Sequence, residues 1–292
     1  MVTLFFPRSE VLFPDIINDK FIKKKKNIMN EHRLRPIFIT GSNSTISNSN
    51  STYTLQFPSS YSPKDEELAL FNLFVYYSWF NMTTAFNNLT CSYTFNGTTY
   101  NVTFPAGYYS VSDISNFIQL QMQINGNYLV DQYGNNVYYL SLVDNPVYYA
   151  VTLTATPVPA SLPSGWTNPN SITLSGDSPQ LNFNTSNFNL LLGFNKSTSY
   201  PATPQTSVYQ INSVITPEIN PVYLVNVSTN MSSNDGLVNV NENVIYQFNP
   251  ENTAFGAQIQ IQPQNLLFVD INKATYTNLV ISLLIKTVRH YK

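Results

Sequence analysis

Most of the chain alternates between apolar and polar positions with the period of two that is typical of β-strands. Ser51–Pro58 is the clearest example, because Tyr53, Leu55 and Phe57 fall on one face and polar residues on the other. Leu68–Phe80 is apolar on both faces, which predicts a central strand covered on each side. The same reasoning predicts strands over residues 35–40, 137–143, 147–153, 208–214, 221–227, 244–248, 257–261, 266–270 and 276–285.

A hairpin is predicted over Cys91–Phe104. Asn96-Gly97 favours a type I′ turn, in which both central residues need a positive φ. Folding the segment about this turn places three residue pairs on one face, so the turn and the pattern agree on a single register. The opposed pairs are Phe95 with Thr98, Tyr93 with Tyr100, and Cys91 with Val102.

The hydrophobic period changes clearly to that of a helix only over residues 114–124. Ser112 is the predicted N-cap, because its hydroxyl can accept an N–H of the first turn. Asp113 places a negative charge at the positive end of the helix dipole, and Gly126 suits a left-handed stop. The apolar stripe consists of Ile114, Phe117, Ile118 and Met122.

Asn, Pro and Gly separate the predicted strands, which indicates an antiparallel sandwich or jelly roll. Residues 156–187 hold five prolines and are expected to be irregular. The chain is long enough, at 292 residues, for one large β domain or two smaller ones. The expected fold class is therefore all-β, with one short helix.

Charged residues make up 10% of the chain, against about 25% in an ordinary soluble domain. Aromatic residues make up 14%. Because so few charges are available, Asn, Ser and Thr must keep the surface solvated. Much of the surface is therefore expected to be buried in an assembly.

Basic residues are concentrated near the N-terminus, where the first 35 positions carry +4 (8 − 4) and the rest −6 (6 − 12). Residues 1–33 are expected to form an arm, which is either a disordered tail or a segment that orders against a neighbouring subunit. Within it, Lys23, Lys24, Lys25 and Lys26 form the one basic cluster. This cluster is either a solvated tail or targeting signal, or a contact for phosphates or an acidic partner.

Catalytic, cofactor-binding and metal sites are not expected. The two histidines, His32 and His290, lie near opposite ends of the chain and show no short ligand spacing with Cys91. A nucleophile elbow, a His-Glu-x-x-His helix and a P-loop are absent from the sequence. Carboxylate pairs for glycoside hydrolysis are the remaining alternative, with candidates Asp65, Glu66, Glu67, Asp113, Asp131, Asp144, Asp177, Glu218, Asp235, Glu242, Glu251 and Asp270.

The two tryptophans are candidates for a platform that stacks sugars. Trp79 ends an apolar strand and is expected in the core, whereas Trp166 lies in a Pro-rich loop and is the candidate surface aromatic. A single cysteine excludes an intramolecular disulfide and suits a reducing compartment. The longest apolar run is shorter than the roughly 20 residues of a membrane helix, so no membrane span is expected.

Three motifs together resemble the penton proteins of virophages and related polinton-like viruses. The first is Phe104–Ser110, which leads into the Ser-Asp-Ile-x-Asn-Phe-Ile-Gln run of Ser112–Gln119. The second is Leu-Pro-Ser-Gly-Trp at residues 162–166. The third is Leu192-Gly193-Phe194 with Tyr200-Pro201, followed by Pro217–Val222. The resemblance extends over roughly residues 50–290 and rests on the order of the motifs, none of which is catalytic.

The resemblance implies a single jelly-roll capsid fold with an inserted outer β domain that carries the helix. Five copies would form a homopentamer at each fivefold vertex of an icosahedral virion assembled in the host cytoplasm, in contact with the major capsid protein. The basic arm would contact that protein, the genome or another internal component. The jelly roll is assigned to residues 34–80 and 207–292, and the inserted domain to residues 81–206.

Two other functions stay open from the sequence. The first alternative is a β-sandwich module that attaches to a host receptor or glycan. The second is a hydrolase on a β scaffold, which would need a buried pair of carboxylates in a cleft.

Overall fold

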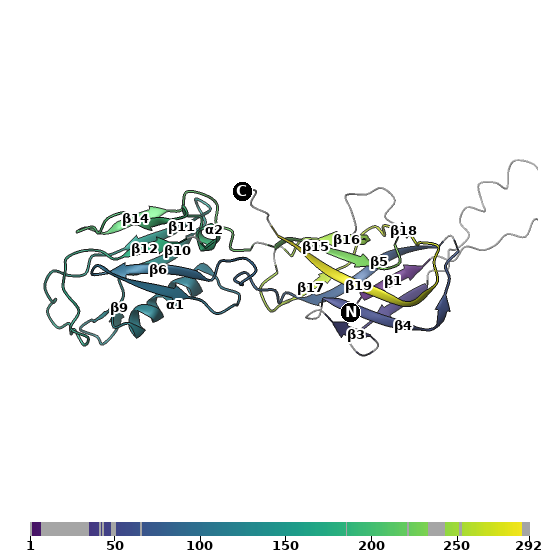
Figure 1. Ribbon diagram of the computed structural model, residues 1–292, viewed down its shortest axis with the longest axis horizontal. Coiled ribbons are helices and arrows are strands. Elements are labelled where there is room, and N and C mark those ends of the chain that lie inside the picture. The colour runs from purple at the N-terminus through teal and green to yellow at the C-terminus, as the bar shows by residue number, and fades with distance from the viewer. Residues whose placement is uncertain are drawn as a thin grey trace, which may run out of the picture. The chain divides into compact units, whose positions relative to one another are not determined.

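The computed structural model describes residues 2–6, 35–40, 42, 44–47, 51–64, 66–184, 186–220, 222–232, 243–250 and 253–287. The chain divides into two compact units (Figure 1). Unit 1 combines Met1–Ser78 with Val222–Lys292, and unit 2 is Trp79–Pro221. Both are built mainly from antiparallel strands, so the all-β prediction is confirmed.

The described residues of unit 1 form two antiparallel sheets. In the first, the strand order is β17-β5-β1-β2, with β18 also paired to β5. In the second, the order is β16-β15-β19-β4-β3, so the last strand that the structure describes lies between β4 and β15. The strands are β1 (Val2–Phe6), β2 (Arg35–Ile39), β3 (Thr45–Ser47), β4 (Thr52–Tyr61), β5 (Glu67–Tyr76), β15 (Val222–Thr229), β16 (Val244–Phe248), β17 (Gln258–Ile261), β18 (Val269–Asp270) and β19 (Tyr276–Thr287).

The apolar segment at 68–80 forms the central strand β5, as predicted. Leu68, Ala69 and Leu70 are all buried, and three consecutive buried residues can only belong to a strand that is covered on both faces. The strand ends at Tyr76, whose side chain is exposed. The prediction was therefore four residues too long at this end.

β1 lies between β5 and β2 and pairs with both in antiparallel fashion. The side chain of Leu4 is fully buried. Residues 2–6 therefore belong to the sheet of unit 1 rather than to the arm expected over residues 1–33. The short apolar cluster at 4–6 gave no sustained period from which this pairing could be predicted.

Unit 2 contains a four-stranded sheet of order β13-β12-β6-β7, a three-stranded sheet of order β10-β11-β14, and the small pair β8-β9. All of its pairings are antiparallel. Its elements are β6 (Thr90–Phe95), β7 (Thr98–Thr103), α1 (Val111–Ile124), β8 (Leu129–Val130), β9 (Asn136–Val137), β10 (Leu140–Asn145), β11 (Ala150–Ala155), β12 (Gln180–Phe183), α2 (Phe188–Leu192), β13 (Thr198–Tyr200) and β14 (Tyr209–Asn212).

The predicted hairpin is confirmed in turn type and register. Asn96 and Gly97 have φ values of 49° and 78°, as a type I′ turn requires. The three predicted pairs are all present, and the rings of Tyr93 and Tyr100 stack with their centroids 5.1 Å apart. Short-range turn chemistry was enough to fix this element.

The helix is confirmed, but the predicted N-cap is wrong by two residues. Ser110, not Ser112, is the N-cap, and its hydroxyl accepts the N–H of Asp113 at 3.2 Å. The Asp113 carboxylate in turn accepts the Ser110 N–H at 3.0 Å, which completes a capping box. The earlier start also makes Val111 helical, and its side chain is buried.

The predicted stop at Gly126 is confirmed, with a φ of 73°. The N–H of Gly126 donates to the carbonyl of Gln123, and the N–H of Asn127 donates to the carbonyl of Met122, which is the Schellman arrangement.

Further along the chain, β12 forms within the segment 156–187 that was expected to be irregular. It has only four residues, so the alternation of Leu181 and Phe183 is too short to stand out among the prolines.

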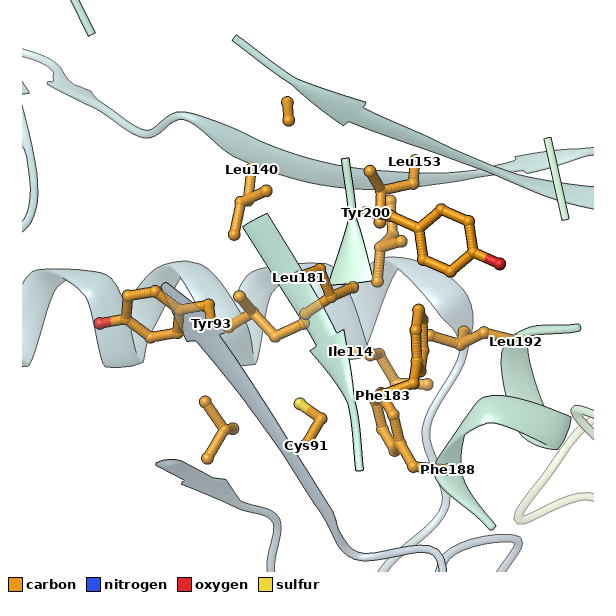
Figure 2. Packing of buried hydrophobic residues seen from close by; sticks show 14 of the residues in the cluster. Cys91, Tyr93, Ile114, Leu140, Leu153, Leu181, Phe183, Phe188, Leu192 and Tyr200 are labelled. Carbon is orange, nitrogen blue, oxygen red and sulfur yellow. The ribbon is translucent and has the colours of Figure 1, made fainter. Parts of the chain in front are cut away.

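The core of unit 2 lies between its sheets and α1. Figure 2 shows Ile114 of α1, Phe183 of β12 and Phe188 of α2 turned toward one another. One continuous cluster contains buried side chains from the hairpin, from α1 and from the later strands as far as Tyr200.

The boundary of unit 2 differs from the predicted one. Residues 209–212 form β14, which pairs with β11 and so lies in unit 2, although residues 207–221 were assigned to the jelly roll.

Candidate functional site

The chain enters unit 2 at Trp79 and leaves it at Pro221, and the buried side chain of Asn81 joins the two segments. Its amide nitrogen donates to the carbonyls of Ile219 and Tyr109, both at 2.8 Å. Its amide oxygen accepts the N–H of Tyr109 at 2.9 Å. One side chain therefore ties three chain segments together. We call this group the junction.

The first motif lies at the junction. Met82 and Gly107 exchange two backbone hydrogen bonds of 3.0 Å, which hold the Phe104–Ser110 loop against the incoming segment. The Tyr108 hydroxyl donates to the side-chain oxygen of Asn220 at 3.1 Å, which links the loop to the outgoing segment. The loop thus bridges the two segments.

Part of the third motif packs against the outgoing segment. Gly193 ends α2 in the left-handed conformation, with a φ of 79°. Its carbonyl accepts the N–H groups of Val214 and Ile215 at 3.0 and 3.1 Å. The N–H of Glu218 donates to the carbonyl of Leu190 at 3.1 Å. The end of α2 therefore holds the chain that leads out of unit 2.

Aromatic stacking connects the first and third motifs. The ring of Phe104 stacks on Phe188 with the centroids 5.3 Å apart. Phe183 lies 6.1 Å from Phe188 and 5.0 Å from Phe194, and Phe194 lies 5.1 Å from Tyr200. These aromatic residues, from the two motifs and from β12 and α2, form part of the core of unit 2.

The second motif lies elsewhere in unit 2, beside β8. Thr167, directly after the motif, exchanges two backbone hydrogen bonds with Val130. Trp166 is half-buried and packs against the core of the unit. Most of its contact is therefore with the protein interior. The other predicted contact residues, Lys23–Lys26, lie outside the described residues.

Tyrosines missed by the sequence reasoning are the most exposed aromatic residues of unit 2. Tyr148 and Tyr149 follow β10 in the turn to β11 and are 70% and 79% exposed, and Tyr133 in the turn between β8 and β9 is 79% exposed. Tyr148 and Tyr149 fell within the strand predicted over 147–153. The signal that could have placed them in a turn is the preceding Asp144-Asn145-Pro146.

Unit 2 is nearly free of charge. From Trp79 to Pro221 it holds six charged residues, one basic and five acidic, for a net charge of −4. The polar part of its surface therefore consists mainly of uncharged side chains such as Asn, Ser, Thr, Gln and Tyr. The six are Asp113, Asp131, Asp144, Asp177, Lys196 and Glu218.

The titratable groups of unit 2 have structural surroundings. Burial raises the pKa of the Cys91 thiol, which disfavours the reactive thiolate. Hydrogen bonds from Ser110 hold the pKa of Asp113 below its ordinary value, as expected of a helix cap. Within the described ranges, no three His, Cys, Asp or Glu side chains lie close enough to hold a metal ion.

A small cavity lies between α1, β10, β11 and β12. It has room for one water molecule at most. Ligand pockets usually enclose about 300 Å³ or more, so this cavity does not suit a cofactor. It is lined by Ser115, Ile118, Leu140, Ser141, Leu142, Leu153 and Leu181. Among the helices that the structure describes, none is long and apolar enough to cross a membrane.

Solved structures that are similar to the chain include the following two. The crystal structure of the mavirus penton protein aligns with a TM-score of 0.44 and 11% sequence identity, over 81% of this chain and 83% of that one. A chain of the 3.5 Å cryo-EM structure of the Sputnik virophage aligns with a TM-score of 0.32 and 12% identity, over 80% and 84%. No family model matches the chain, and no curated protein matches it.

Proposed function

We propose that the protein is a structural penton protein that forms pentamers at the fivefold vertices of a virophage-like capsid. Unit 1 would form the jelly roll of the capsid wall, and unit 2 would be the inserted outer domain. The proposal starts from the order of the three sequence motifs, which resembles that of virophage penton proteins. It requires no catalytic residue or cofactor.

The observation that carries the proposal is the path of the chain through unit 1. The unit consists of two antiparallel sheets, as a double-sheet jelly roll does. Unit 2 is inserted between β5 and β15, and the chain then returns to place β19 between β4 and β15. A two-sheet domain interrupted by one self-contained unit is the organisation that the resemblance implies.

The composition supports a protein that is part of an assembly rather than a free monomer. Permanent interfaces are depleted of charged residues and enriched in aromatic ones. The chain has 10% charged and 14% aromatic residues. Five identical copies around an axis would use head-to-tail contacts that close into a ring.

The proposed partners follow from this position. The rim of the pentamer would contact the major capsid protein, and the Lys23–Lys26 cluster would contact that protein, the genome or another internal component. The site of action would be the vertex of the virion, after assembly in the host cytoplasm. The single cysteine suits such a reducing compartment.

Native mass spectrometry of the purified chain, combined with negative-stain imaging, tests the proposal. The expected particle is a ring with five times the 33.0 kDa mass of one chain. A stable dimer or trimer would contradict it. If the chain is monomeric, fivefold placement in assembled particles becomes the deciding measurement, and its absence there would refute the vertex position.

A second function, attachment to a host receptor or glycan, is favoured by the exposed tyrosines of unit 2. Tyrosine provides a large amphipathic contact at low entropic cost, and binding loops that recognise diverse ligands are rich in Tyr, Ser, Gly and Asn. Substituting Tyr148 and Tyr149 by Ala should abolish binding in a glycan-array or cell-binding assay if this function is present. Unchanged binding, or no binding by the original chain, would argue against it.

A further inference from the structure

The two larger sheets of unit 2 have four edge strands: β7 and β13 in one, β10 and β14 in the other. An edge strand exposes backbone N–H and C=O groups that can pair with another chain, so proteins usually shorten, cover or charge such edges. The four edges of unit 2 differ in this respect. Two are protected and two are open.

The edge of β10 is covered by α1. The N–H of Leu142 points away from β11 and donates to the Ser115 hydroxyl at 3.0 Å. The carbonyl of Leu140, on the same edge, accepts from the side-chain amide of Gln119 at 3.1 Å. Side chains of α1 thus already bond to the backbone groups of β10 with which another strand would have to pair.

The edge of β13 is protected by its length and by proline. The strand has three residues and is followed directly by Pro201, which has no N–H to donate. A neighbouring strand would find too few backbone groups there to form a ladder.

The edge of β7 is open. The N–H of Phe104 donates to the carbonyl of Leu89 at 2.8 Å, so Phe104 is one of the residues whose backbone groups point toward β6. Backbone groups alternate in direction along an antiparallel strand, so those of Thr99, Asn101 and Thr103 point away from β6. These residues are exposed, and their outward groups have no hydrogen-bond partner in the described part of the chain. None of the six residues of β7 is charged or a proline.

The edge of β14 is open in the same way. The N–H of Ser213 donates to the carbonyl of Val151 at 2.8 Å, which directs the backbone groups of Gln210 and Asn212 away from β11. Both residues are exposed, and their outward backbone groups lack a partner among the residues that the structure describes. This strand also contains no charge and no proline.

We propose that β7 of one copy pairs with β14 of the next copy, so that the outer units are joined by a continuous backbone ladder. This inference rests on the proposed pentamer. Two different open edges on one unit suit a head-to-tail contact, in which each copy offers one edge and receives the other. Repeating this contact five times can close a ring.

The faces of the two strands match in this pairing. On β7, the residues with outward backbone groups also face solvent, while Tyr100 is half-buried on the other face. On β14, Gln210 and Asn212 face solvent, and Tyr209 and Ile211 are half-buried against the core. Joining the edges therefore places polar side chains beside polar ones and apolar side chains beside apolar ones.

Charge favours a second copy as the occupant. Unit 2 has one basic residue, and neither edge carries a charge that could select an acidic or basic partner. Each open edge therefore suits an extended strand without charged residues. The chain itself supplies such a strand on the other open edge.

A pair of introduced cysteines tests the contact. Residues that face each other across an antiparallel ladder have Cα atoms about 5.5 Å apart, within the range that a disulfide spans. The variant carries Asn101→Cys and Gln210→Cys, and the native Cys91 is fully buried, so it does not compete. Mild oxidation of the assembled full-length protein is expected to give a ladder of covalent oligomers that ends at the pentamer.

Each single cysteine variant is the control and is expected to stay uncrosslinked. A covalent dimer of Asn101→Cys alone would overturn the inference in favour of two-fold pairing of β7 with itself. Pentamers that form without crosslinks in the double variant would also overturn it, while leaving the vertex function intact. Absence of any assembly, in solution and in particles, would refute both.

A charge on the edge provides a second measurement. Asn101→Lys places a cation on the proposed ladder and is expected to weaken the association of copies about tenfold, measured by sedimentation equilibrium. Thr90→Lys is the matched control, because Thr90 is exposed on the same face of the sheet but belongs to the interior strand β6. Equal effects of the two variants would contradict edge pairing.

Discussion

The carbonyl oxygen of Ile215 occupies the space into which a side chain at Gly193 would project. A Cβ on Gly193 would overlap this oxygen, and the left-handed φ of 79° disfavours any other residue as well. The glycine of the Leu-Gly-Phe motif is thereby explained. It lets the chain that leaves unit 2 lie directly against the end of α2.

Gly193→Ala should destabilise unit 2 strongly, by about 3 kcal/mol, because backbone strain adds to steric overlap. Urea denaturation measures the change. Gly97→Ala is the matched control, since Gly97 has a φ of 78° and open space around it. It should cost only about 1 kcal/mol. Equal losses in the two variants would mean that Ile215 can move aside.

Asn81→Ala should loosen both segments at the junction. The change removes three hydrogen bonds and leaves backbone groups of Tyr109 and Ile219 without these partners in a partly buried site. The expected cost is about 3 kcal/mol, with faster proteolysis next to residues 79–82 and 217–221. Asn220→Ala, which removes an exposed contact with Tyr108, should change little. Unaltered proteolysis in Asn81→Ala would count against the junction.

Two buried tyrosines should respond differently when changed to phenylalanine. The Tyr93 hydroxyl accepts from the side chains of Asn125 and Asn127 at 2.9 and 3.0 Å, so Tyr93→Phe should cost about 1–3 kcal/mol. The Tyr139 hydroxyl is buried without a partner among the described residues, and burial raises its pKa to about 12. Tyr139→Phe should therefore leave the free energy of unfolding unchanged or raise it by about 1 kcal/mol. A comparable loss in both would contradict this assignment.

The capping box predicts a pH dependence with a definite sign. Hydrogen bonds from Ser110 lower the pKa of Asp113 in the folded state, so its contribution to stability is present above the unfolded value of about 3.9. The contribution is lost as the pH falls through the lower folded pKa. Because the Asp113 carboxylate is exposed and screened by solvent, Asp113→Asn should be less stable than the original chain by only about 0.5 kcal/mol at pH 7. Thermal unfolding should show this difference shrinking at pH 3, and a constant difference would exclude the carboxylate as its source.

Elements set by neighbouring residues were predictable from the sequence, and elements set by distant ones were not. The Asn96-Gly97 turn fixed the register of its hairpin because the signal lies within a few residues. The helix cap was misplaced since Ser110 and Ser112 offer the same hydroxyl, and only the reciprocal contact with Asp113 distinguishes them. β1 depends on pairing with β5, about 65 residues away, and its own pattern is too short to reveal this.

The candidate site shows the same division. Gly193 and the Phe104–Ser110 loop stand out in the sequence as motif residues. Asn81 was not, because one asparagine among many carries no local signal of its three buried hydrogen bonds. The open edges were also hidden, since a strand becomes an edge only through the order of its sheet.

The junction gives unit 2 a property that matters over evolutionary time. Because Asn81 fastens the incoming segment to the outgoing one, both ends of the inserted unit are held by its own residues. Substitutions and insertions can then accumulate between these ends, or unit 2 can be exchanged as a whole, without a change in the path of the strands of unit 1.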